Sequence, residues 1–130
     1  EEEFGLILSK TKTDKINHIK TEKKVLGFDH TEVGKAMAIN WNLPQELAEV
    51  IGGHHNPDNI AQEFVRAGST LYVADYVCQQ KGLGYSDAPI RDKGLFRRCL
   101  KRLDVTSYAL DLIVEEVEQK LFKMEEQGLF

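Results

Sequence analysis

Three histidines and one aspartate of this sequence have residue types and a spacing that suit a metal site. His54 follows Leu47 by seven residues, nearly two helical turns, so both side chains would share one face of a helix. Asp75 follows Leu71 by four residues and falls in an apolar stripe, where a carboxylate is costly unless it is paired or binds a cation. Four side chains are therefore candidates to converge on one metal site, although spacing alone favours a structural role for them: His30, His54, His55 and Asp75.

Neutral imidazoles and a carboxylate are suitable ligands for a divalent metal such as Mn²⁺, Fe²⁺, Co²⁺ or Zn²⁺. Such an ion can lower the pKa of a bound water and can stabilise a phosphoryl group. Neighbours in a helix point about 100° apart, so His54 and His55 would serve two metals, or one metal and a second contact, more easily than one ion together. The alternative is structural: histidines at a helix end interact well with its dipole, and Asp75 would pair with His55 or an arginine.

A second candidate is the basic segment between Arg91 and Arg102, which holds six basic residues and only one acidic residue, Asp92. Three of its side chains are candidates for holding a phosphate or an acidic partner face: Arg97, Arg98 and Lys101. The alternative is a solvated helix face that pairs with the acidic residues of the last helix, Glu115, Glu116 and Glu118. We favour this alternative because isolated charge runs are usually solvated.

The elements that must position these residues have the helical period, and runs of strand type are nearly absent. The pattern predicts helices over about 14–26, 31–41, 44–53, 62–80, 95–103 and 107–124, and a further helix beginning near Phe4. Asp29 and Glu32 form the pattern of a capping box, and Pro44 separates two helices. The buried stripe of the 62–80 helix is expected to hold Phe64, Ala67, Gly68, Leu71, Ala74, Asp75 and Cys78. We predict an all-α fold, an irregular multi-helix bundle.

Composition excludes several classes of protein. The chain has 130 residues, 42% hydrophobic and 29% charged, which is typical of one soluble globular domain. Its net charge of -4 argues against a protein that coats nucleic acid, so no DNA partner is expected. No apolar run is long enough to span a membrane, and Cys78 and Cys99 form no C-x-x-C pair. We expect a cytoplasmic chain with reduced thiols, a single domain over 1–130 that is a C-terminal piece of a larger domain or chain.

Four segments resemble HDOD domains, the HD-related output domains of bacterial signalling proteins. They occur in the family's order: VLGFDHTEVG at 25–34, WNLP at 41–44, IGGHHNP at 51–57 and VADY at 73–76. The resemblance implies an all-α bundle of the HD superfamily, which includes metal-dependent phosphohydrolases and the HD-GYP cyclic-dinucleotide phosphodiesterases. Carried over by motif, His30, His54, His55 and Asp75 match the later metal ligands of that superfamily.

The same resemblance weighs against catalysis. The sequence contains no His-Asp dipeptide, and no Gly-Tyr-Pro follows His55. HDOD domains are thought to act mainly as non-hydrolytic modules, so we predict a regulatory or output module that binds signalling partners or a nucleotide-like ligand. A divalent metal would then bind weakly or not at all, and the alternative is a metal-dependent phosphohydrolase or cyclic-dinucleotide phosphodiesterase. Gly52 and Gly53 each weaken a helix by about 1 kcal/mol relative to alanine, and an early helix end would re-aim His54.

Overall fold

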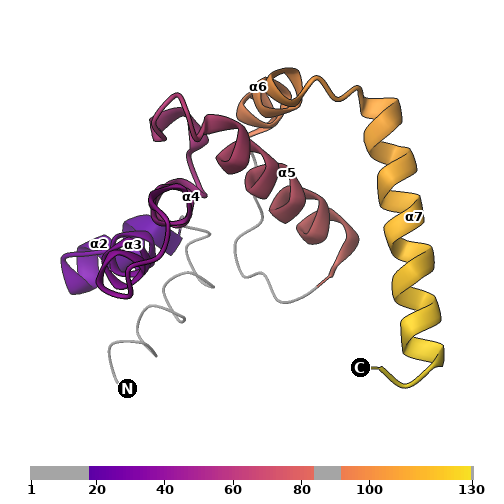
Figure 1. The fold of residues 1–130 in the computed structure, drawn as a ribbon, viewed down its shortest axis with the longest axis horizontal. Helices are drawn as coiled ribbons and strands as arrows, with labels where there is room; N and C mark the ends of the chain where they lie inside the picture. The colour runs from indigo at the N-terminus through magenta and orange to yellow at the C-terminus, as the bar shows by residue number, and fades with distance from the viewer. Residues whose placement is uncertain (1–17, 84–91, 130) are drawn as a thin grey trace.

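The computed structural model describes residues 18–83 and 92–129, and within them every regular element is a helix. The prediction of an all-α bundle is therefore confirmed. No helix in this described part is both long enough and apolar enough to cross a membrane. Along the chain (Figure 1) the elements are α2 (His18–Leu26), α3 (His30–Asn40), α4 (Gln45–Gly53), the short 3₁₀ helix η1 (Pro57–Asn59), α5 (Val65–Lys81), α6 (Lys93–Leu103) and α7 (Ser107–Glu126).

The helix ends follow the local chemistry of the sequence. Asp29 caps α3, and Pro44 precedes the first residue of α4. Gly82, with a φ of 67°, ends α5 in the left-handed conformation that glycine adopts at low cost. α5 begins at Val65 because residues 62–64 form a turn. The expected helix near Phe4 and residues 14–17 lie outside the described residues.

The main core lies between α5 and α6. It contains Tyr72, Val73, Leu95, Cys99 and Leu100, all of them buried. The buried stripe that the sequence predicts for the 62–80 helix, now α5, was therefore wrong in register. α5 buries Val65, Ser69, Tyr72 and Val73. Of the residues we expected in the stripe, Gly68 is buried, whereas Leu71 is 41% exposed and Ala74 is also exposed.

A second contact joins α4 to α5 through Ile60, which follows η1 and is buried. Its side chain lies between two glycines, Gly53 at the end of α4 and Gly68 in α5. A Cβ atom added to either glycine would overlap Ile60, at Cγ1 for Gly53 and at Cδ1 for Gly68. Both positions therefore need glycine so that this isoleucine can fit between the two helices.

α7 differs from the other helices because none of its residues is buried. In Figure 1 it lies on the far side of α5 from α3 and α4. The expected pairing of the basic α6 with the acidic α7 was wrong for the described residues. Two arginines of α6 pair with Asp58 instead, Glu118 pairs with Lys81 of α5, and Glu116 pairs with Lys120 one turn along α7.

Candidate functional site

Three of the four predicted residues come together where α3 begins and α4 ends. The ring centroid of His30 lies 5.4 Å from that of His54 and 5.0 Å from that of His55. The two neighbouring histidines are closer still, with centroids 4.0 Å apart. Each ring offers one nitrogen such that all three atoms lie within 4.8 Å of one another, which is a suitable arrangement for a metal ion.

His30 is positioned by the capping box of α3. The Asp29 carboxylate accepts hydrogen bonds from the backbone N–H groups of Thr31 and Glu32, at 3.0 and 3.1 Å, and from the Thr31 hydroxyl at 2.6 Å. Glu32 closes the box by accepting from the Asp29 N–H at 3.0 Å. Burial alone would raise the pKa of Asp29, but these hydrogen bonds outweigh it and hold that pKa below its ordinary value.

Replacing Asp29 with alanine should lower the free energy of unfolding by about 1–2 kcal/mol at neutral pH, because the cap of α3 is lost. The folded-state pKa of Asp29 is depressed, so its contribution is present at pH 7 and is lost as the pH falls below about 4. Urea unfolding at pH 7 and pH 3 measures both effects. Asp29→Asn, which keeps a capping oxygen, is the control. If Asp29→Ala lowered the free energy of unfolding as much at pH 3 as at pH 7, Asp29 would not act as an ionised cap of α3.

His54 and His55 share one site because α4 ends at Gly53. His54 is the C-cap residue and His55 lies in the following turn. The expectation that the two side chains diverge by a helical step was therefore wrong. It assumed a continuous helix, whereas the early end foreseen at the glycine pair is what the structure contains.

Two of the imidazoles have their inner nitrogen held by a protein acceptor. Nδ1 of His30 lies 2.6 Å from a carboxylate oxygen of Glu22, and Nδ1 of His54 lies 2.7 Å from the carbonyl oxygen of Ile51. A carbonyl oxygen can only accept, so His54 donates from Nδ1. In the neutral ring, Nε2 then carries a lone pair that is free to bind a metal. Acceptors of this kind orient metal-binding histidines and fix their tautomer.

His55, which is half-buried, completes the set. Its Nε2 lies 2.9 Å from Nε2 of His30. Burial, together with the charges that His54 and His30 would carry, lowers the pKa of His55 to about 4. His55 is therefore a neutral imidazole at pH 7, the form that binds a metal. By their donor chemistry, the three residues fit one divalent first-row ion.

Comparison with known proteins agrees with this architecture. The family model of the HDOD domain matches residues 1–57, a range that contains all three histidines. These residues belong to the HDOD domain family. The fold of the chain is similar to that of an HDOD domain protein of unknown function from Geobacter sulfurreducens, with a TM-score of 0.69 and 24% sequence identity. The alignment covers 95% of this chain and 44% of that one, so the chain spans less than half of its structural relative.

No curated protein sequence matches the chain. The resemblance to HDOD domains is nevertheless confirmed by the family match, and the likeness in structure confirms the fold.

Asp75 is not part of the histidine cluster. It lies in α5, and its carboxylate accepts a hydrogen bond from Gln79, one turn later, at 3.1 Å. Its selection rested on sharing a buried stripe with Leu71, which the structure places at the surface. The structure thus brings together three of the four residues chosen from the sequence.

The basic residues of α6 lie in a separate part of the chain, outside the residues that the family model matches. Arg98 donates from Nε and Nη2 to one carboxylate oxygen of Asp58, at 3.2 and 2.9 Å, and Arg102 pairs with the other oxygen. The hydrogen bond from Arg102 is the main reason that the pKa of Asp58 is lowered. These contacts tie η1 to α6, so Arg98 is already engaged. Arg97 and Lys101 are exposed on α6, and their phosphate role stays a prediction.

Glu22, the partner of His30, is not predicted from the sequence. It lies eight residues earlier, in a lysine-rich helix that carries no signal of a site. Its approach depends on the bend at Gly27 between α2 and α3, where φ is 85°. One pattern could have indicated it. Glu22 lies between one and two helical turns before Gly27, and Gly27 is followed by Asp29, which caps the helix that begins at His30.

Proposed function

We propose that this chain is a non-catalytic regulatory module of signal transduction, and that its three-histidine cluster is the ligand site. The ligand is a single divalent first-row transition metal ion, with Zn²⁺ or Co²⁺ favoured over Mn²⁺ because all three donors are imidazoles. The observation that carries the proposal is the convergence of His30, His54 and His55 within 4.8 Å. The outer contacts to Glu22 and to the Ile51 carbonyl support it.

The donor set argues against two-metal phosphoryl transfer. Two-metal phosphoryl transfer needs ions about 3.5–4 Å apart, held as a pair by shared ligands. The described cluster offers three imidazoles and no carboxylate ligand, which suits one ion. Such an ion would supply charge and join the start of α3 to the turn after α4, so its binding would stabilise this end of the bundle.

The test uses the purified chain after removal of metal with a chelator. Titration with Co²⁺, followed by its visible absorption, and competition with Zn²⁺ should give one ion per chain. An ion at 100 times its dissociation constant should stabilise the fold by about 2.7 kcal/mol. The same samples are assayed for turnover of bis(p-nitrophenyl) phosphate and cyclic di-GMP, with Mn²⁺ and Fe²⁺ included, and none is expected.

Each other outcome points elsewhere. Two ions per chain with turnover would support the alternative, a metal-dependent phosphohydrolase or cyclic-dinucleotide phosphodiesterase. A folded chain that binds none of these ions would contradict the proposed ligand and leave the histidines with a structural role.

A further inference from the structure

The last helix has an apolar seam that the described residues cover only in part. Leu110, Val114, Val117, Leu121 and Met124 follow one another at alternating steps of four and three residues, the spacing of a helix that packs along another helix. None of them is buried, and Val117 and Met124 are 43% and 38% exposed. A 20-residue helix with such a seam normally buries it, so the seam is a candidate contact surface.

The first three residues of the seam, Leu110, Val114 and Val117, line a groove between α5 and α7 that has two hollows. One has a volume of 530 Å³ and the other of 430 Å³, and Val77, Leu110 and Val114 line both. The wall of the smaller hollow is mainly apolar and includes Val73, Ala74, Leu103, Val105 and Ile113. The two hollows therefore lie along the same narrow contact of α7 with α5, and they offer apolar side chains to a further element.

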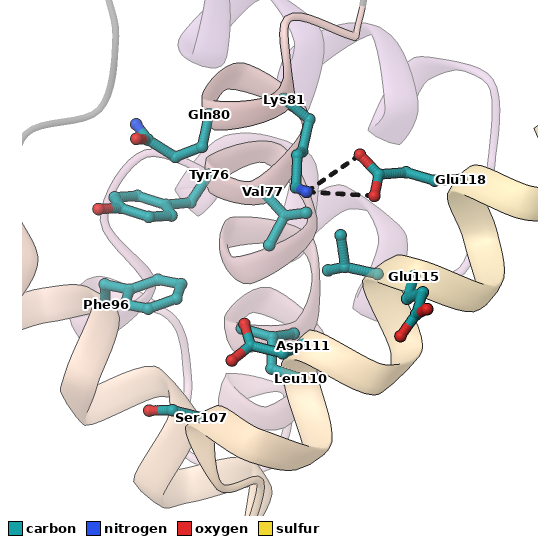
Figure 2. Close-up of a pocket in the computed structure, with 11 residues that line it drawn as sticks. Tyr76, Val77, Gln80, Lys81, Phe96, Ser107, Leu110, Asp111, Glu115 and Glu118 are labelled. Carbon is teal, nitrogen blue, oxygen red and sulfur yellow. Dashed lines mark hydrogen bonds and ion pairs between the residues drawn. The ribbon is translucent and has the colours of Figure 1, made fainter.

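The rim of the larger hollow is acidic. In Figure 2, Asp111, Glu115 and Glu118 come from α7, Glu118 points toward Lys81 of α5, and the stacked rings of Tyr76 and Phe96 lie on the other side of the hollow. Lys81 pairs with Glu118 alone, at 3.0 Å, and neither Asp111 nor Glu115 has an ion-pair partner among the described residues. The rim keeps two carboxylates available beside an apolar floor.

We infer that this groove binds an amphipathic helix of a partner protein, with its apolar face on the seam and basic residues on the acidic rim. Helices bind in apolar grooves through residues one turn apart, and complementary charges on the rim set the orientation and the partner. A basic partner suits the acidic rim better than a second copy of α7 does, because α7 itself carries six acidic and only two basic residues. This interface is separate from the histidine cluster.

Two neighbouring residues of α7 provide a matched test. Ile113 lines the groove and is 51% exposed, whereas Leu112 is 48% exposed and lines neither hollow. The probe is a fluorescent helical peptide about two heptads long, with leucine on one face and lysine on the other. Its binding is measured by anisotropy beside a peptide with glutamate in place of lysine.

The lysine peptide should bind, the glutamate peptide should not, and Ile113→Glu should weaken binding at least about tenfold. Leu112→Glu, which adds the same charge, should have little effect, and Glu115→Gln should reduce the dependence on salt. The proposal would be overturned if Ile113→Glu and Leu112→Glu weakened peptide binding equally. It would also be overturned if the lysine and glutamate peptides bound equally well. Sedimentation showing a dimer that Ile113→Glu abolishes would assign the groove to a second copy. His55→Ala should keep the peptide affinity, so the two proposals fail separately.

Discussion

Replacing His55 with alanine should lower the affinity of the chain for Zn²⁺ by more than about 100-fold, because even the loss of an outer partner of a metal ligand typically costs 10–100-fold. His55 is the member whose Nε2 lies 2.9 Å from that of His30, and the substitution leaves only two imidazoles. Competition with a chromophoric chelator measures the change.

Asp75→Asn is the matched control for His55→Ala, because the structure keeps Asp75 hydrogen bonded to Gln79 and outside the cluster. Its affinity for Zn²⁺ should equal that of the unaltered chain. Urea unfolding without metal verifies that both variants are folded. If Asp75→Asn lowered the affinity for Zn²⁺ as much as His55→Ala does, Asp75 would join the site when the metal binds, as the sequence pattern predicts.

The sequence was sufficient for features set by short-range chemistry. Asp29 and Glu32 form the capping box that their spacing predicts, and this box places His30 at the start of α3. Pro44 separates α3 from α4, and the weak helix formers Gly52 and Gly53 indicated the early end of α4. These signals act within one helical turn, so they survive without knowledge of the tertiary structure.

The errors arose where a helix has two apolar sides. α5 packs Tyr72 and Val73 on α6, while Ala74 and Cys78 line the groove towards α7. The sequence shows one broad apolar band there, and periodicity cannot tell which edge is buried. Asp75 was placed in the core by that ambiguity. The pairing of His30 with Glu22 depends on the angle between two helices, which single-sequence patterns do not contain.

Replacing Gly53 with alanine should lower the free energy of unfolding by about 1–3 kcal/mol, because the new Cβ overlaps Ile60. Alanine gains at most about 1 kcal/mol of helix propensity, which is too little to compensate. Urea unfolding of Gly53→Ala and of the neighbouring Gly52→Ala gives the comparison. At Gly52 the Cβ would lie 2.7 Å from Cδ of Lys35, a side chain that can move aside, so the cost should be smaller.

The contact can be isolated by combining Gly53→Ala with Ile60→Ala. Ile60→Ala is itself destabilising because it opens a cavity, but it removes the atoms that the alanine at 53 would meet. In that background Gly53→Ala should cost nothing or become slightly stabilising, a non-additivity expected for residues in contact. An unchanged penalty would show that Gly53 is required for its backbone and not for Ile60. Because Gly53 immediately precedes the turn that carries His54 and His55, the Gly53→Ala variant should also bind Zn²⁺ more weakly, and Gly52→Ala should not.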